Sequence, residues 1–163
     1  MNVIHSLGEE VQQKSTSVSS FLITNKKGGF YLGSVSENIT KFNGLFFMDD
    51  WNMRKIVERI GIPGKATEII ATGYSYILKH RRAEEQFYLN HTNTMIYEVE
   101  KYSKPIELTL DCRDIYDFSD EGRIYSISEE NGCTIVKYTK FVDNSLQEKK
   151  YDFFIAIKTN MLL

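Results

Sequence analysis

Short blocks rich in β-branched and aromatic residues recur along this chain from Phe21 onward, and their spacing restricts the fold more than any other feature. Blocks of this kind at short spacing are typical of β-sandwiches and β-barrels. They are too numerous for a doubly wound α/β fold, in which helices separate the strands. We therefore predict an all-β antiparallel fold, with strands at residues 21–24, 30–35, 45–48, 66–78, 86–89, 95–99, 106–110, 123–127, 134–142 and 151–157.

The dipeptide Asn131-Gly132 gives the most specific local prediction. Both residue types tolerate the positive φ angles of a two-residue hairpin turn, so the strands on either side are predicted to pair antiparallel. The second of these strands, "CTIVKYTKFV", alternates and carries apolar side chains on both of its faces. Such a strand fits a sheet that is covered by a partner sheet on one face and contacted on the other.

Two segments are harder to assign. In residues 50–61 the apolar side chains recur at helical spacing and also alternate, so periodicity allows a helix or a strand, and "GIPG" at 61–64 ends the element in either case. Residues 9–20 are polar and lack periodicity, so residues 1–20 are predicted to form an N-terminal arm or a short frayed helix. The β-sandwich domain is expected to cover residues 21–163.

The charge and hydropathy of the chain argue against two classes of partner. The formal net charge is -2 and basic residues are interleaved with acidic ones, so no basic surface for nucleic acid is expected. No apolar run approaches the roughly 18 residues that a membrane-spanning helix needs. The N-terminus also lacks the basic-then-apolar order of a signal peptide. A soluble, cytoplasmic protein with no membrane partner is the expectation.

Cysteine and histidine do not form a recognisable metal site. The two cysteines, Cys112 and Cys133, lack the paired spacing of a zinc site and are too few for a disulfide framework, so we predict reduced thiols in or near the core. His5, His80 and His91 are too scattered in the sequence to form a local zinc site. No metal and no cofactor is therefore predicted.

Acidic residues are abundant, but the sequence does not single out a catalytic pair. A glycoside hydrolase would hold two carboxylates apart on a rigid frame, and nothing selects such a pair here. Four aspartates spaced three apart lack the glycine and the closing glutamate of a calcium loop, and we predict solvated turn acids. They are Asp111, Asp114, Asp117 and Asp120. The basic run at residues 79–82 is followed by two glutamates and is predicted to be a solvated hairpin end.

Trp51 is the most specific candidate for a ligand contact. It lies in the polar stretch "MDDWN" after a predicted strand, where an indole ring has little packing reason to be. Aromatic rings serve sugar-binding surfaces because the apolar face of a pyranose stacks on them while their polar edges hydrogen-bond. Sheets also favour aromatic residues for packing alone, and this structural interpretation is preferred for Tyr31, Tyr74, Tyr76 and Tyr125.

Several short motifs together resemble the N-terminal domain of prokaryotic glycogen debranching enzymes of the amylo-α-1,6-glucosidase type. The stretch "FLITNKKGGFYLGSVSENITKFNGLFF" and the later "LTLDCRDIYDF" follow the order of that family: a strand ending in Thr-Asn, a glycine-rich turn, a Thr-rich approach to a His-Gly-Leu strand, and a distant Arg-Asp pair. The resemblance covers residues 21–118, and Asn43 stands where the family commonly has histidine. The matching positions are Thr24, Asn25, Gly28, Gly29, Phe30, Thr40, Gly44, Leu45, Arg113 and Asp114.

This resemblance implies a large antiparallel sandwich of the galactose-mutarotase-like, supersandwich kind that precedes glucoamylase-like (α/α) barrels. It also implies that the catalytic acid and base belong to the barrel, so that this chain alone is inactive. The expected partners are a helical-barrel catalytic domain or subunit and an α-glucan such as glycogen or a maltooligosaccharide. Trp51, Arg113 and Asp114 are the expected contacts in the glycan groove or at the interface, with a structural ion pair open for the last two.

Two other functions stay open. A self-sufficient carbohydrate-binding module would keep the aromatic contact without a catalytic partner. A small enzyme on a sandwich scaffold is ranked last, because no nucleophile, base or metal set stands out. The apolar ending at residues 161–163 fits a cut through a longer protein or an edge that a partner covers, so a fragment or a split subunit is expected.

Overall fold

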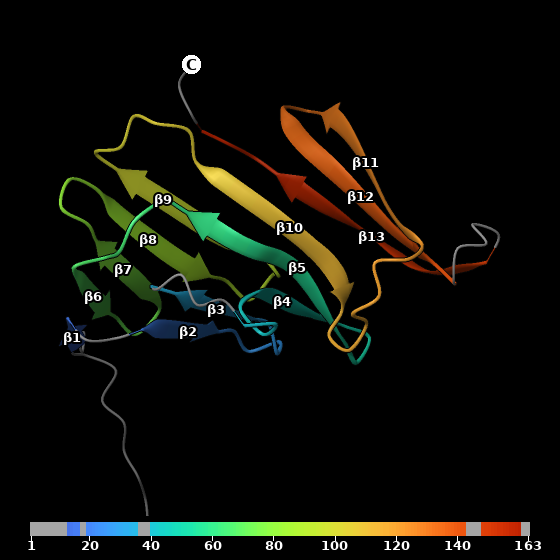
Figure 1. The fold of residues 1–163 in the computed structure, drawn as a ribbon, viewed down its shortest axis with the longest axis horizontal. Coiled ribbons are helices and arrows are strands. Elements are labelled where there is room, and N and C mark those ends of the chain that lie inside the picture. The colour runs from blue at the N-terminus through green and yellow to red at the C-terminus, as the bar shows by residue number, and fades with distance from the viewer. Residues whose placement is uncertain (1–12, 17–18, 36–39, 143–147, 161–163) are drawn as a thin grey trace, which may run out of the picture. The chain divides into compact units, whose positions relative to one another are not determined.

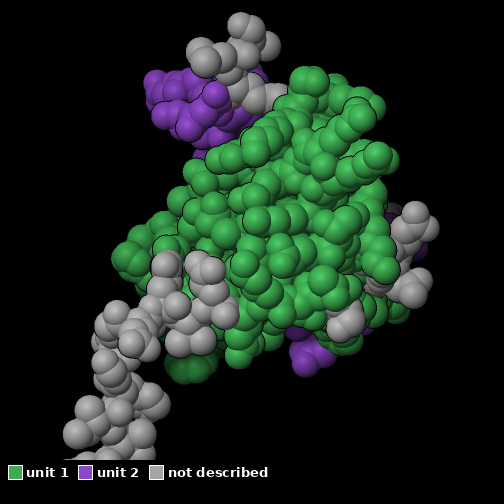
Figure 2. All heavy atoms as spheres, turned by 90° about the vertical axis from the view of Figure 1, so that its left-hand side faces the viewer, with its two compact units in different colours: residues 1–111 green, residues 112–163 purple. Residues whose placement is uncertain are grey.

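The computed structural model describes residues 13–16, 19–35, 40–142 and 148–160. Every helix or strand assigned in these ranges is a β-strand, and each pair of strands with a defined register is antiparallel. The predicted all-β antiparallel fold is therefore confirmed. Contacts within the chain gather into two compact units, residues 1–111 and 112–163 (Figure 2). The extent of a single domain over residues 21–163 stays a prediction.

Unit 1 holds two five-stranded sheets (Figure 1). The first has the order β1-β6-β7-β8-β9 and consists of β1 (Gln13–Ser15), β6 (Glu68–Ala71), β7 (Ser75–Lys79), β8 (Glu84–Leu89) and β9 (Met95–Glu100). The second has the order β10-β5-β4-β3-β2 and consists of β10 (Glu107–Asp114), β5 (Asn52–Gly61), β4 (Gly44–Asp49), β3 (Phe30–Ser34) and β2 (Ser20–Thr24). The last residues of β10 belong to unit 2.

Aromatic side chains fill the space between these two sheets. The ring of Phe21 on β2 lies 5.1 Å from that of Tyr76 on β7 and 5.1 Å from that of Phe87 on β8, so the inner faces of the sheets meet there. A Cβ atom at Gly33 would lie 2.2 Å from Cζ of Phe21, and glycine therefore leaves the room that this ring occupies. The predicted sandwich is confirmed in unit 1, where burial of such rings is a main source of stability.

Unit 2 contains a three-stranded sheet of order β11-β12-β13, formed by β11 (Arg123–Glu130), β12 (Cys133–Phe141) and β13 (Lys149–Ile157). Tyr138 of β12 is fully buried, and its ring lies 5.1 Å from those of Tyr125 and Phe153 on the neighbouring strands. Asn131 and Gly132 have φ angles of 51° and 73° and connect the antiparallel strands β11 and β12. The hairpin predicted at this dipeptide is confirmed.

Two sequence assignments are resolved by the structure. Residues 50–61, which fitted a helix or a strand, contain the strand β5. Residues 66–78, predicted as one strand, form β6 and β7 with a turn between them, so that prediction is wrong. The hydroxyl of Thr72 accepts hydrogen bonds from the backbone N–H groups of Tyr74 and Ser75 at 3.3 and 2.9 Å. This polar turn interrupts a run that is apolar on both sides.

Some predictions fall on residues that the structure does not describe. Residues 13–15 of the predicted arm form β1, which pairs with β6, whereas residues 1–12, 17 and 18 lie outside the described ranges. The apolar ending at residues 161–163 also lies outside them. Both cysteines are free, with Cys112 buried and Cys133 half-buried, in agreement with the predicted core and near-core thiols.

Candidate functional site

Asn25 organises the turn between β2 and β3. Its Oδ1 accepts hydrogen bonds from the backbone N–H groups of Lys27 and Gly29 at 2.9 and 2.8 Å, and its Nδ2 donates to the carbonyl oxygen of Asn90 at 2.9 Å. Gly28 has a φ angle of +83°, a conformation that glycine adopts without steric cost. Asn25 and Gly28, two of the positions on which the predicted family resemblance depends, therefore build a turn and tie it to the neighbouring sheet.

Asn43 also stabilises the framework of the fold. It is 5% exposed, and its Oδ1 accepts hydrogen bonds from the backbone N–H of Thr40 at 2.6 Å and from the hydroxyl of the same residue at 2.8 Å. Its Nδ2 donates to the carbonyl oxygen of Leu32 at 3.3 Å. The next residue, Gly44, has a φ angle of +115° and lies so close to β5 that a Cβ atom would be 2.0 Å from the carbonyl oxygen of Val57.

Three hairpin turns of unit 1, at residues 25–29, 49–52 and 90–94, define a surface that we call the Trp51 end. The hydrogen bond from Asn25 to Asn90 ties the first turn to the third. A Cβ atom at Gly28 would be 3.4 Å from Cε of Met48, which places the first turn beside the end of β4. Trp51 lies in the second turn and is 95% exposed.

The backbone of Trp51 has an unusual conformation. Asp50 and Trp51 have φ angles of 42° and 67° and lie between Asp49 and Asn52, which face each other across the β4–β5 hairpin. Two-residue hairpin turns with two positive φ angles favour Asn-Gly or Asp-Gly. A left-handed conformation at a residue other than glycine costs about 1–2 kcal/mol. Trp51 thus keeps an exposed indole ring at a position where glycine would be more stable, and such an outlier keeps it a candidate for the predicted ligand contact.

The second and third turns of the Trp51 end are held by local hydrogen bonds. Oδ1 of Asn90 accepts from the backbone N–H groups of Thr92 and Thr94 at 2.8 and 3.2 Å. Nδ2 of Asn52 donates to the carbonyl oxygen of Asp50 at 3.2 Å. These contacts hold the backbone of the turns, so the Trp51 end offers an exposed indole ring beside polar groups. That combination fits the apolar face and hydroxyl groups of a sugar.

Arg113 and Asp114, the other predicted contacts, lie in unit 2 at the end of β10. Arg113 is 3% exposed, and its Nη1 donates to the carbonyl oxygens of Asp114 and Ile115 at 3.3 and 2.9 Å. Its guanidinium group also lies 4.7 Å from the ring centroid of Phe118. The backbone N–H of Asp114 donates to the hydroxyl of Tyr151 at 2.9 Å. These contacts organise the chain after β10, and a glycan contact by either residue stays a prediction.

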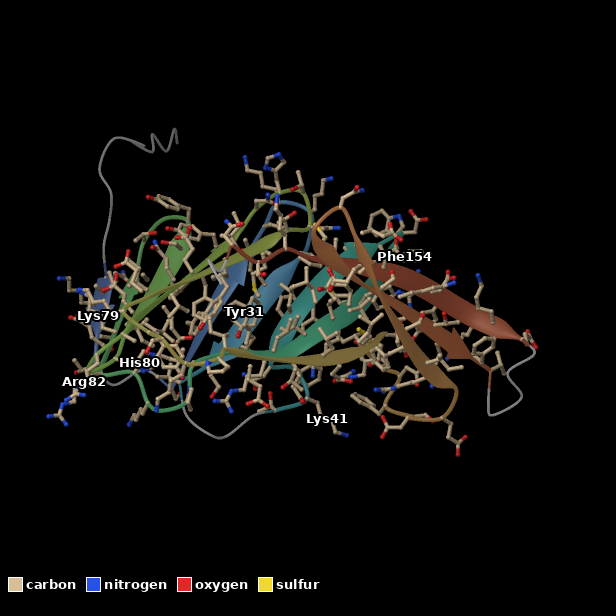
Figure 3. The ribbon with its side chains drawn as sticks, turned by 90° about the horizontal axis from the view of Figure 1, so that it is seen from above. Tyr31, Lys41, Lys79, His80, Arg82 and Phe154 are labelled. Carbon is tan, nitrogen blue, oxygen red and sulfur yellow. The ribbon has the colours of Figure 1, made fainter. Side chains whose placement is uncertain are left out.

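A cavity of about 780 Å³ in unit 1 was not predicted from the sequence. It is bordered by both sheets and by the loop after β5. Glu85 in its wall is 3% exposed, and its Oε1 lies 2.6 Å from Nε2 of His80. Its Oε2 accepts from the hydroxyl of Tyr97 at 2.6 Å and from the backbone N–H of Ile62 at 3.1 Å. Figure 3 labels His80 on the β7–β8 turn and Tyr31, another wall residue, on β3.

Two tyrosines near this cavity are held in the neutral form. Burial raises the pKa of Tyr97 strongly, and the hydrogen bond to the Glu85 carboxylate raises it further. Burial is also the main cause of the raised pKa of Tyr31, whose hydroxyl donates to the carbonyl oxygen of Ile60 at 3.4 Å. Both phenols therefore act as hydrogen-bond donors at neutral pH.

Two of the predicted solvated turn acids are instead partly buried in ion pairs. Asp111 lies within β10, and its Oδ2 is 2.8 Å from Nζ of Lys55, which is 1% exposed. Asp117 pairs with Lys140 at 3.4 Å and is 10% exposed in its side chain. The prediction is wrong for both, because buried lysines on other strands need a carboxylate partner. Asp120, by contrast, is 93% exposed.

The basic run at residues 79–82 forms the hairpin end that was predicted, between β7 and β8. Arg81 and Arg82 are exposed, as expected of a solvated turn. His80 differs, because its side chain is 10% exposed and is paired with Glu85. His80 and Glu85 lie on either side of the β7–β8 turn. Their separation of five positions is the feature of the sequence that could have indicated this pairing.

No protein-family model, no curated protein and no solved structure matches this chain. Within the ranges that the structure describes, no three His, Cys, Asp or Glu side chains are grouped so that they could hold a metal ion. In the same ranges, no helix has the length and apolar character that a membrane crossing requires.

Proposed function

We propose that this chain is a non-catalytic β-sandwich domain of an α-glucan-debranching enzyme in the cytoplasm. In this proposal the domain supports a helical-barrel catalytic domain or subunit and contributes to the α-glucan groove. The observation that carries the proposal is the structural role of the residues on which the resemblance to the debranching family was based. Asn25, Gly28 and Gly44 build turns and a close strand contact, and these framework roles support the proposal.

The glycan contact is assigned to the Trp51 end. An indole ring that is 95% exposed on a hydrogen-bonded turn is accessible for stacking on the apolar face of a pyranose. The net charge of -2 also suits a neutral ligand better than a polyanion. Asp114 is proposed to lie at the interface with the catalytic partner, and the buried Arg113 to hold that segment of the chain in place.

The test is a titration of the chain with maltooligosaccharide and with glycogen, repeated on Trp51→Ala. Tyr116→Ala is the matched control, because Tyr116 is an aromatic residue that is 78% exposed and lies outside the Trp51 end. We expect binding by the parent chain and by the control, and loss of about tenfold or more in Trp51→Ala, the scale of a stacked ring. Equal glycan affinity of the parent chain, Tyr116→Ala and Trp51→Ala would show that Trp51 does not contact the glycan.

A self-sufficient carbohydrate-binding module is the second candidate function. The exposed indole ring of Trp51 supports this function as much as the first. The two proposals differ in the need for a partner. Glycan affinity that is unchanged by adding a helical-barrel catalytic domain favours the module, whereas a stable complex with that domain favours the supporting role. Hydrolysis of an α-1,6-branched glucan by this chain alone would contradict both.

A further inference from the structure

The cavity of unit 1 has the size and the apolar wall of a small-molecule site. Its volume of about 780 Å³ lies within the range of roughly 300–1,000 Å³ that such sites occupy. Tyr31 and Phe87 are wall residues whose rings stack at a centroid distance of 5.4 Å with an interplanar angle of 15°. Phe21, Ile60 and Ile62 extend this apolar wall. The body of a ligand would therefore meet rings and aliphatic groups.

Within the described ranges, the carboxylates of the cavity wall have polar partners, whereas its exposed cations do not. Of its two carboxylates, Glu58 lies 3.7 Å from Nζ of Lys55, and Glu85 accepts hydrogen bonds from Tyr97 and Ile62 and contacts His80. The cations Arg59 and Lys65 also line the cavity and are exposed to solvent. Neither has a carboxylate within ion-pair distance in the described part of the chain. The charged wall groups without an ion-pair partner among the described residues are therefore the two cations, Arg59 and Lys65.

His80 provides a further polar group on the wall. Its Nε2 is occupied by Glu85 at 2.6 Å, while its Nδ1 has no hydrogen-bond partner among the described residues. A carboxylate that holds one ring nitrogen fixes the orientation of the imidazole and sets the role of the other nitrogen. The second nitrogen is left for a polar group of a bound molecule.

From these three observations we propose that the cavity of unit 1 binds a small organic anion. The acidic group lies at Arg59 and Lys65, the apolar body lies along Tyr31 and Phe87, and His80 hydrogen-bonds the bound molecule. A phosphate ester and a carboxylate share the chemistry that the two cations recognise. This site is separate from the Trp51 end and does not depend on the proposed α-glucan function.

The test uses phenyl phosphate and phenylacetate as ring-bearing anions, with inorganic phosphate and benzyl alcohol as controls that supply the charge or the ring alone. Binding is measured by calorimetry at low salt, and the imidazole signals are followed by NMR, with the His80 signal assigned from His80→Gln. We expect saturable binding of one or both ring-bearing anions, about tenfold or more tighter than either control, with a shift of the His80 signal. The preferred anion identifies the acidic group that the site takes.

The matched variants are Arg59→Gln with Lys65→Gln, and Arg81→Gln with Arg82→Gln. Both pairs remove two exposed cations, but only the first pair lines the cavity. We expect the first pair to weaken binding about tenfold or more and the second to change it less than about twofold. Equal loss in the two pairs, binding of benzyl alcohol as tight as that of the anions, or no saturable binding would overturn the proposal.

Discussion

The hydroxyl of Tyr97 on β9 donates a hydrogen bond of 2.6 Å to Oε2 of Glu85 on β8, the carboxylate that also contacts His80. Two carboxylate oxygens of Glu85 contact Tyr97, Ile62 and His80, and Glu85→Gln replaces one of these oxygens by an NH₂ group that cannot accept a hydrogen bond. We therefore expect a loss of about 1–3 kcal/mol in the free energy of unfolding. Denaturant titration measures it. Glu84→Gln is the control, because Glu84 is half-exposed with a distant partner at 3.9 Å, and its change should stay within about 0.5 kcal/mol. Equal effects at both positions would contradict the role given to Glu85.

Gly44→Ala is expected to be among the most damaging single substitutions in unit 1. The added Cβ atom would lie 2.0 Å from the carbonyl oxygen of Val57, on a backbone with a φ angle of +115°. We expect a loss of more than about 3 kcal/mol, seen as a failure to fold or a large fall in the denaturation midpoint. At Gly73 no atom lies within 4 Å of the added Cβ, so Gly73→Ala should change stability by less than about 1 kcal/mol. Normal stability in Gly44→Ala would rule out the close strand contact.

Tyr31→Phe should make the protein less sensitive to alkali. Because burial raises the pKa of Tyr31 above its ordinary value of 10.0, the unfolded chain loses this proton at a lower pH than the folded protein does. The stabilising contribution is complete below pH 10 and falls as the pH rises further. We expect similar stability of parent and variant near neutral pH and a smaller decline in the variant above pH 10. Unfolding curves recorded over that range test this, and identical declines would contradict it.

Asp117→Asn should remove part of the acid sensitivity of unit 2. Burial alone would raise the pKa of Asp117, but Lys140 and Lys150 together lower it below the ordinary value of 3.8. Its contribution is present at neutral pH and is lost as the pH falls through 3.8 toward the lowered pKa. We expect the variant to be about 1–3 kcal/mol less stable than the parent at pH 7, with the difference shrinking in acid. A difference that is constant with pH would mean that the ion pair does not contribute.

Trp51→Gly should stabilise unit 1 while weakening a glycan contact. The indole ring is 95% exposed, so little packing is lost, and glycine relieves the left-handed backbone at this position. We expect a gain of about 1 kcal/mol in the free energy of unfolding together with loss of glycan binding. Thermal unfolding and the glycan titration are measured on the same samples. A loss of stability would show that the ring packs on the protein and would weaken the functional assignment.

Strand positions and turns could be predicted where the signal is local. The Asn131-Gly132 hairpin depends on the φ preferences of two adjacent residues, and it appears as predicted. The turn at Thr72 was missed, because apolar residues on both sides hide a short polar interruption. Asp111 and Asp117 were taken for solvated acids because their lysine partners come from other strands. The exposure of Trp51 agrees with its polar surroundings in the sequence, but its left-handed backbone was not predicted.

The sequence by itself determined the all-β antiparallel class, since alternation and turn preference act over a few neighbouring residues. It also determined the net charge of the chain. Only the tertiary structure decided that Tyr31, Glu85 and Arg59 line one cavity, because they come from three different strands. Which charges remain uncompensated depends on distances between such strands, and sequence spacing does not encode those distances until the sheets have packed.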